Sequence, residues 1–205
     1  MNQSGSNNLP DAGRTRTSGR LFVVSAPSGA GKTTLCEAVR QRLPDLVYSV
    51  SSTTRSPRKG EQEGKDYFFV TEAQFQKGIA NGQWAEWARV HDNYYGTSNR
   101  FLESHLAAGR DVLLDIDVQG AEQIVARYPQ AITIFIMAPS LEVLRQRLIA
   151  RGLDTPEVIA KRLDNAKAEI DCRGMYRHVV VNDDLDAAIG QLAAILTGKA
   201  DGHGR

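Results

Sequence analysis

Residues 26–34 read Ala26-Pro27-Ser28-Gly29-Ala30-Gly31-Lys32-Thr33-Thr34; the apolar run Leu21 to Val24 precedes them, and an amphipathic stretch begins at Thr33. A strand, a small-residue loop and a helix in this order match the P-loop pattern, except that Ala26 replaces its first glycine. Alanine is excluded at that position only if the backbone needs a positive φ there. The stretch therefore predicts a phosphate-binding loop between a buried strand and a helix.

The loop offers three kinds of contact to a phosphate. Its small residues let successive backbone N–H groups close on phosphate oxygens, and the helix N-terminus adds its positive dipole. Lys32 supplies a full charge for the β and γ phosphates, and Thr33 offers a hydroxyl to Mg²⁺. The alternative is a glycine-rich turn that caps a helix and carries an exposed lysine. A P-loop indicates a nucleotide but leaves the reaction open.

The alternation of strand and helix continues beyond the loop. Apolar runs typical of strands buried on both faces of a parallel sheet occur at Leu21 to Val24, Val112 to Leu114, Ile132 to Met137 and Val179 to Val181. Helical patterns follow them at Thr33 to Leu43, Gln119 to Arg127, Ser140 to Ala150 (with Ser140 as N-cap) and Leu185 to Leu196. This order predicts an α/β fold with a doubly wound parallel-sheet core.

Residues 48–97 break this alternation. One helix pattern, Glu72 to Ala80, stands among strand patterns at Tyr48 to Thr53, Asp66 to Val70 and Trp84 to Val90, which predicts an inserted mixed α+β subdomain. Thr155 and Pro156 begin a helix that runs to about Asp171 and is polar on most of its circumference, as is typical of a lid. We expect a core of residues 20–47 and 98–197, with the lid at about 140–173.

Composition narrows the partners and the compartment. The chain has 205 residues, with 25 Lys and Arg against 24 Asp and Glu, so its overall charge favours neither nucleic acid nor a membrane surface as partner. No apolar run approaches the roughly 18 residues that span a bilayer. Cys36 and Cys172 fit no CxxC spacing, which favours a reducing, cytoplasmic location. Residues 1–19 and 198–205 are polar and predicted to be disordered and flexible tails.

A second polar cluster lies in the inserted subdomain: Ser51-Ser52-Thr53-Thr54-Arg55-Ser56-Pro57-Arg58-Lys59-Gly60-Glu61, then Gly64-Lys65-Asp66-Tyr67-Phe68-Phe69. Arg55, Arg58 and the Tyr67 hydroxyl suit a monophosphate dianion, which they can hold by charge-assisted hydrogen bonds. The run resembles the GMP-binding signature of guanylate kinases, and the resemblance extends from about residue 20 to residue 196. It implies a P-loop nucleoside monophosphate kinase of purine metabolism that transfers the γ-phosphoryl group of ATP to GMP with Mg²⁺.

The resemblance also implies a reader of the guanine base. Guanine presents two N–H donors beside the O6 acceptor, so a reader needs a carboxylate and a hydroxyl, and Glu86 and Ser51 fit these roles. Taken alone, Glu86 is more typical of an exposed strand carboxylate, and Tyr95 of a packing aromatic. Glu61 would orient the arginines or reach the base through water. The implied GMP-binding set is Ser51, Arg55, Arg58, Glu61, Tyr67, Glu86, Tyr95, Thr97 and Asp117.

Two aspartates follow a buried strand. Asp115 ends the run Val112 to Leu114 and resembles the Walker B aspartate, which reaches Mg²⁺ through a water, so Thr33 and Asp115 are the expected metal residues. Asp117 points to the same side, because side chains alternate along a strand. In the alternative, either aspartate caps the helix near Gln119.

Arginines are expected to neutralise the phosphoryl group in flight. Arg147 and Arg151 share one helix face, Arg162 lies on the lid, and the three match arginines that close over the phosphates in the family. With Lys32 and Arg58 they form the implied catalytic set. Asn182 matches a residue that contacts adenine and joins residues 26–34 in the implied ATP site. Taken alone, the arginines could be solvated surface residues and Asn182 a helix cap.

Two other functions are open at this stage. Guanylate-kinase-like domains also serve as catalytically silent binding modules, which typically have degraded P-loops, whereas Lys32, Thr33 and Asp115 are all present here. The second alternative is a kinase for another phosphorylated substrate. The sequence leaves open whether dGMP is also an acceptor and which oligomeric state the protein adopts.

Overall fold

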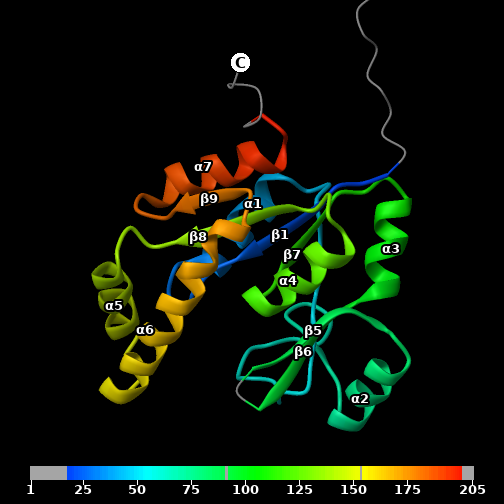
Figure 1. Cartoon of the computed structure of the whole chain (residues 1–205), viewed down its shortest axis with the longest axis horizontal. Helices are drawn as coiled ribbons and strands as arrows, with labels where there is room; N and C mark the ends of the chain where they lie inside the picture. Colours follow the sequence, from blue (N-terminus) through cyan, green and yellow to red (C-terminus); the bar gives the residue numbers. More distant parts are fainter. Residues whose placement is uncertain (1–17, 91, 153, 200–205) are drawn as a thin grey trace, which may run out of the picture.

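The computed structural model describes residues 18–90, 92–152 and 154–199. They form a five-stranded sheet, a four-stranded sheet and the helices around them, and the smaller sheet lies at the lower right of Figure 1. Most of the two predicted tails, residues 1–17 and 200–205, lies outside the described residues. Of the tail residues that the structure describes, Gly19 donates its backbone N–H to the Leu106 carbonyl at 2.9 Å.

The larger sheet is parallel throughout, with the strand order β2-β7-β1-β8-β9. Every residue of the central strand β1 is buried, because strands pair with both of its edges and helices cover both of its faces. The predicted strands of the parallel sheet are confirmed within one residue at each end. The strands are β1 (Leu21–Ser25), β2 (Val47–Tyr48), β7 (Val112–Asp115), β8 (Ile132–Met137) and β9 (His178–Val181).

Helices pack on both faces of this sheet (Figure 1). Helices α1 and α7 cover one face, where Leu35 and Leu192 join the same apolar cluster as Phe22. Helices α3 and α4 cover the other face, where Leu102 and Ile124 pack with the strand residues of a second cluster. The doubly wound α/β fold is therefore confirmed. The helices are α1 (Lys32–Arg42), α3 (Asn99–Ala107), α4 (Val118–Arg127) and α7 (Leu185–Leu196).

The smaller sheet has the order β4-β3-β6-β5 and carries one helix, α2. The ring of Phe75 on α2 stacks on Trp84 and Tyr94, with centroids 4.4 and 5.3 Å away. The Gln123 side chain of α4 bonds both the N–H and the carbonyl of Trp87 on β5, which ties this sheet to the core. Its elements are β3 (Ser52–Thr53), β4 (Phe68–Phe69), α2 (Glu72–Ala80), β5 (Trp84–Val90) and β6 (Asn93–Ser98).

Two expectations for the inserted region need correction. The predicted strand Tyr48 to Thr53 is wrong as a single element, because the chain leaves the parallel sheet after β2 and enters the smaller sheet at β3. The strand expected at Asp66 to Val70 shortens to β4. Strand β6 and helix α3 were not predicted: β6 has no apolar alternation, and α3 buries only Leu102 among its residues.

The predicted lid region contains two helices and a short 3₁₀ turn: α5 (Leu141–Ala150), α6 (Pro156–Asp171) and η1 (Cys172–Met175). Ser140 and Thr155 cap the two helices as expected. Only Ala166 of α6 is buried, and it packs with Leu144 of α5, so the two helices form a small unit of their own beside the sheet. In the described ranges, no helix combines the length and the apolar character that crossing a membrane requires.

Candidate functional site

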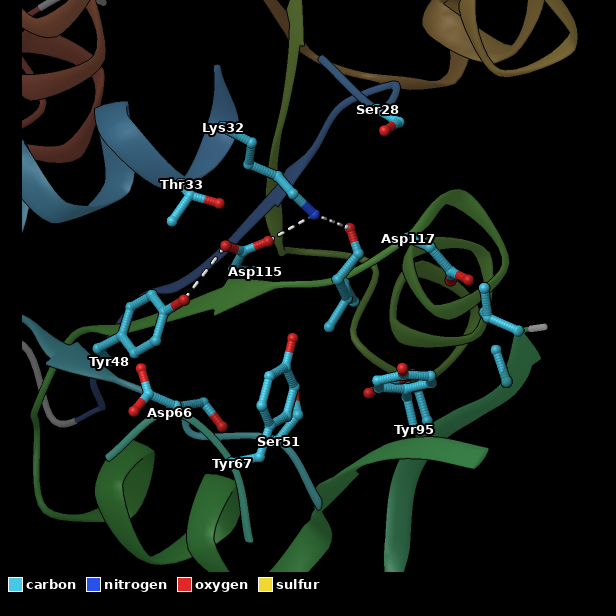
Figure 2. A pocket seen from close by; sticks show the side chains of 15 residues that line it. Ser28, Lys32, Thr33, Tyr48, Ser51, Asp66, Tyr67, Tyr95, Asp115 and Asp117 are labelled. Carbon is cyan, nitrogen blue, oxygen red and sulfur yellow. Dashed lines mark hydrogen bonds and ion pairs between the residues drawn. The ribbon is translucent and has the colours of Figure 1, made fainter. Parts of the chain in front are cut away.

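A cavity of about 400 Å³ opens where the central strands end and the smaller sheet faces them (Figure 2). Side chains from both sheets line it, as the parallel topology dictates for the carboxyl edge of the strands. Among them are these predicted site residues: Ser28, Lys32, Thr33, Ser51, Tyr67, Glu86, Tyr95, Asp115 and Asp117. The structure thus brings part of the predicted ATP set, both metal residues and part of the predicted GMP set around one space; Arg55, Arg58, Glu61 and Thr97 do not line it.

Helix α1 begins at the edge of this cavity without a side-chain cap. Its N-cap residue is Gly31, whereas α2 to α7 each begin with a side chain that accepts a hydrogen bond from the first turn. The first N–H groups of a helix have no partner inside the helix. Those of α1 are therefore available to an anion, which their dipole also attracts.

Backbone conformation explains the glycines of the loop. Gly29 and Gly31 have φ of 93° and 94°, which only glycine adopts readily. Ala26 is not among the described residues with positive φ, so alanine is accommodated in place of the usual first glycine. The Ala30 N–H donates to the Pro27 carbonyl at 3.1 Å, which closes the turn.

Lys32 extends to Asp115 at the edge of the cavity (Figure 2). Its Nζ lies 2.5 Å from Asp115 Oδ1, and the Tyr48 hydroxyl donates to Asp115 Oδ2 at 3.2 Å. Burial alone would lower the pKa of Lys32, but the neighbouring Asp115 outweighs it, so the pKa is raised. The lysine is therefore charged, and its carboxylate partner is held from two sides.

Asp117, not Asp115, caps helix α4. Its Oδ1 accepts from the Gly120 N–H at 2.8 Å, and the same side chain also lines the cavity. The alternative in which Asp115 is a helix cap is therefore wrong. Asp117 both caps α4 and lines the cavity.

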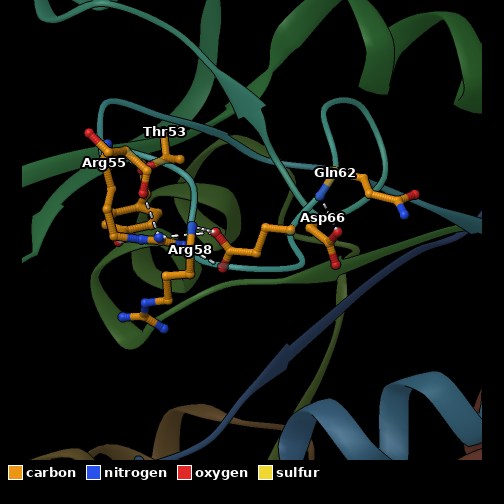
Figure 3. Close-up of polar contacts among 8 residues, drawn as sticks. Thr53, Arg55, Arg58, Gln62 and Asp66 are labelled. Carbon is orange, nitrogen blue, oxygen red and sulfur yellow. Dashed lines mark hydrogen bonds and ion pairs between the residues drawn. The ribbon is translucent and has the colours of Figure 1, made fainter.

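Arg55 is held in place by Glu61 and Tyr95 (Figure 3). Its two terminal nitrogens donate to the Glu61 carboxylate at 3.1 and 2.8 Å, and its Nε donates to the Tyr95 hydroxyl at 3.3 Å. The hydrogen bond with Arg55 lowers the pKa of Glu61. Arg58 donates its backbone N–H to Glu61 at 2.7 Å, while its guanidinium is exposed and extends away from the cluster.

Glu86 is buried, with 4% of its surface exposed, so the alternative of an exposed strand carboxylate is wrong. Its Oε1 accepts the Thr97 hydroxyl at 2.6 Å, from the cross-strand neighbour on β6. Burial raises the pKa of Glu86 to about 7; the Thr97 hydrogen bond opposes this shift and the charge of Asp117 adds to it. A carboxyl group with this pKa changes its charge near neutral pH.

A second hollow of about 420 Å³ lies on the other side of the loop, against α5 and the end of β9. The Asn182 side chain donates to the Ala30 carbonyl at 2.8 Å, and the Asn182 carbonyl accepts from Arg147 at 2.8 Å. Asp184, not Asn182, caps α7, so the helix-cap alternative for Asn182 is wrong. The predicted site residues that line this hollow are Gly29, Gly31, Thr34, Arg147, Arg151 and Asn182.

Arg162 connects the lid to the loop. Its guanidinium lies 3.2 Å from the Asp154 carboxylate and donates to the Ser28 hydroxyl at 3.4 Å. Neither it nor Arg147 nor Arg151 lines the main cavity. The lid arginines thus lie around the loop, and the structure does not gather them at one point.

Sequence reasoning missed six residues that line the cavity, namely Tyr48, Ser49, Asp66, Ala88, Val90 and Ile116. Tyr48 ends β2, and the carboxyl ends of neighbouring parallel strands meet at one edge, so the strand pattern held a signal for it. Asp66 stood within a predicted strand but lies in the turn before β4, where it accepts from the Gln62 N–H at 2.8 Å. Gly64, which has a φ of 72° in this turn, was a local signal for it in the sequence.

Comparisons with a family model, with curated proteins and with solved structures all match guanylate kinases. The family model for guanylate kinase matches residues 18–199. The guanylate kinase of Dechloromonas aromatica is 50% identical over 178 residues, which cover 87% of this chain and 88% of the relative. That of Carboxydothermus hydrogenoformans is 46% identical over 88% of this chain and 89% of its own length. The crystal structure of guanylate kinase from Anaplasma phagocytophilum superposes with a TM-score of 0.73 at 35% identity, over 90% of this chain and 88% of that one.

The contact between Gly31 and Asn182 can be tested with a matched pair of variants. Gly31 and Gly60 have φ of 94° and 95°, so alanine strains the backbone equally at both, by about 1–2 kcal/mol. A β-carbon at Gly31 would overlap Asn182 Nδ2, whereas one at Gly60 would meet nothing within 4 Å. We expect Gly31→Ala to lower the free energy of unfolding by about 1–3 kcal/mol more than Gly60→Ala, because the Asn182 hydrogen bond is lost.

Urea denaturation of both variants measures this difference. Equal losses would contradict the packing role of Gly31. In the background of Asn182→Ala the overlap is absent, so the extra loss from Gly31→Ala should shrink, which a double-mutant cycle measures.

Proposed function

The chain belongs to the guanylate kinase family, and from this premise we propose that it transfers the γ-phosphoryl group of ATP to GMP, giving ADP and GDP. It is a nucleoside monophosphate kinase. The observation that carries the proposal is a single cavity with a cationic loop at one end, at Lys32, and a buried carboxylate at the other, at Glu86. Two nucleotides that meet through their phosphates fit a space with these two ends.

The donor end would hold the phosphates of ATP. The uncapped N-terminus of α1 offers backbone N–H groups, and Lys32 adds a full charge. Thr33 and Asp115 line the same space with a hydroxyl and a carboxylate, the hard oxygen ligands that suit Mg²⁺, directly or through water. When bound, Mg²⁺ would offset charge on the β and γ phosphates. Lys32 would then exchange Asp115 for a phosphate oxygen.

The nucleotide beyond the phosphates would follow the second hollow. Arg147 and Arg151 line it, and Asn182 stands at its wall with its amide group on the loop. In this arrangement Asn182 supports the adenine site by fixing the loop. The lid with Arg162 would close over the phosphates, exclude water and align the two substrates.

The acceptor end would hold GMP. Arg55, Arg58, Tyr67 and Tyr95 are the groups for its phosphate; Arg55 is already oriented by Glu61. Tyr67 and Tyr95 pack edge to face, with centroids 5.9 Å apart, so their hydroxyls arise from one rigid pair. Glu86, Ser51, Thr97 and Asp117 are the groups for the base.

The transfer needs alignment more than acid–base chemistry. An oxygen of the GMP phosphate forms a bond to the γ-phosphorus, and the bond from that phosphorus to the oxygen bridging it to the β phosphate breaks, which releases ADP. The phosphate of GMP is largely ionised near neutral pH, so it needs no general base.

Cys36 and Cys172 are both free thiols, which supports the cytoplasm as the proposed location.

A coupled assay of ADP release across the four nucleoside monophosphates tests the function. We expect GMP to be phosphorylated at least about a hundredfold faster, by kcat/KM, than AMP, CMP or UMP, because unpaired buried acceptors reject the other bases. Similar rates for all four would favour a kinase for another substrate class. Binding of GMP without turnover would favour a silent binding module, and dGMP is measured alongside.

Lys32→Ala separates the two ends of the cavity. We expect turnover to fall by roughly 10²–10³-fold, because the variant lacks the positive charge of Lys32 that would stabilise the transferred phosphoryl group. GMP affinity should change less than about twofold. Steady-state kinetics and calorimetric titration with GMP measure the two quantities. Lys77→Ala, on the exposed surface of α2, is the control and should change neither. A large loss of GMP affinity in the Lys32 variant would contradict the assignment of two ends.

The raised pKa of Glu86 gives GMP binding a pH dependence. In the free protein the carboxyl is protonated below its pKa of about 7, and only the ionised form accepts both N–H groups of guanine. GMP binding therefore releases a proton, and affinity should rise from pH 6 to pH 8 by about tenfold and then level off. Calorimetric titrations at constant ionic strength measure it.

The phosphate of GMP has its own second ionisation near pH 6, which acts in the same direction. Glu86→Gln keeps the contribution of the phosphate and removes that of the carboxyl group. The GMP affinity of this variant should therefore change less with pH and be lower at every pH. A variant profile as steep as that of the parent protein would exclude Glu86 as the titrating group.

A further inference from the structure

Gly120 lies in the first turn of α4, directly beside the carboxylate of Glu86. A β-carbon added to Gly120 would lie 2.5 Å from Glu86 Oε2 and 3.4 Å from Asp117 Oδ1. The first distance is far below van der Waals contact, and the second is an ordinary contact. Any side chain at position 120 would therefore occupy the place where the Glu86 carboxylate lies.

Backbone conformation does not explain this glycine. Gly120 is not among the glycines with positive φ, and it lies inside a regular helix, where alanine is favoured over glycine by about 1 kcal/mol. The absence of a side chain at Gly120 therefore weakens the helix. The missing side chain instead leaves space for the Glu86 carboxylate.

The other neighbours of Glu86 fix the carboxylate in this place. Its Oε1 takes the Thr97 hydroxyl at 2.6 Å, and Glu86 pairs with Thr97 across β5 and β6. Burial of the side chain leaves it little freedom to take another rotamer. With one oxygen bound to Thr97 and the other against Gly120, the carboxylate has one orientation.

We infer that Gly120 is a positioning residue for base recognition: its missing side chain admits the Glu86 carboxylate to the orientation that receives the two N–H donors of guanine. The inference rests on the proposed function for the identity of the base. Gly120 itself donates its N–H to Asp117, the other carboxylate near the base, so the first turn of α4 orders both acidic groups.

Gly120→Ala tests the inference with inosine monophosphate as the second substrate, because this nucleotide lacks the exocyclic amino group and keeps the ring N–H. Displacement of the Glu86 carboxylate costs GMP two hydrogen bonds and inosine monophosphate one. We expect kcat/KM to fall at least tenfold for GMP and much less for inosine monophosphate, so the ratio between them falls. The KM for ATP should stay within about twofold of the parent value.

The fold should survive this change, because the atoms that a β-carbon displaces are the terminal carboxylate atoms of one side chain and not backbone atoms, and because alanine favours the helix. Thermal unfolding checks that Tm does not fall. Gly190→Ala is the matched control: it lies within α7, and a β-carbon there would meet nothing within 4 Å. It should change neither the ratio between the two substrates nor the KM for ATP.

An equal loss for both substrates, or an unchanged ratio, would overturn the inference. Glu86→Asp provides an independent test, because its side chain is one methylene shorter and leaves room for a β-carbon at position 120. In that background Gly120→Ala should reduce GMP affinity by a smaller factor than in the parent protein, and equal factors would overturn the inference. A parent protein with no preference for GMP would instead refute the proposed function.

Discussion

The site depends on the parallel pairing of β1 with β7, in the register that sets Val24 opposite Asp115. Both strands end at the same edge of the sheet, so the loop after β1 places Lys32 Nζ 2.5 Å from Asp115 Oδ1. The pairing of β2 on the other side of β7 brings the Tyr48 hydroxyl to the second oxygen of the same carboxylate. A slip of one residue between β1 and β7 would turn Asp115 toward a helix-covered face, and the apolar strand residues prevent it.

The buried carboxylate of Glu86 follows a different logic. Burial penalises its charge, and Thr97 is the hydrogen-bond donor that offsets part of the penalty. Guanine would supply the remaining donors, whereas adenine would place an acceptor nitrogen against the carboxylate. Because an unsatisfied buried acceptor costs about 1–3 kcal/mol, or more when it is charged, the environment that raises this pKa would, in the proposed function, also be the source of base specificity. Specificity and pH dependence would then be two results of one desolvated group.

The sequence predicted most of the core, because Phe22 to Val24 and Ile134 to Ile136 belong to apolar runs long enough to identify a strand locally. It failed where partners decide the structure. Tyr48 and Ser52 belong to different sheets, although the three residues between them include no glycine or proline. Strand β6 is a strand because β3 and β5 pair with it. The loop residues were found through a motif, but the burial of Glu86 and the contact with Gly120 arise from α4 packing on β5, which no local pattern records.

Two cations that are assigned to phosphates share one arrangement, since Lys32 is paired with Asp115 and Arg55 with Glu61 before any substrate binds. Each carboxylate holds its cation in a fixed place and keeps it from being buried without a partner, which would cost several kcal/mol. In the proposed function a phosphate would have to share or replace that carboxylate, so part of its attraction would be offset and only a strongly charged ligand in the right position would gain from the exchange. Neutral ligands could not make this exchange. The two ion pairs would therefore contribute selectivity for phosphate at both cations, at some loss of affinity, and Lys32 would leave Asp115 when the donor phosphates bind.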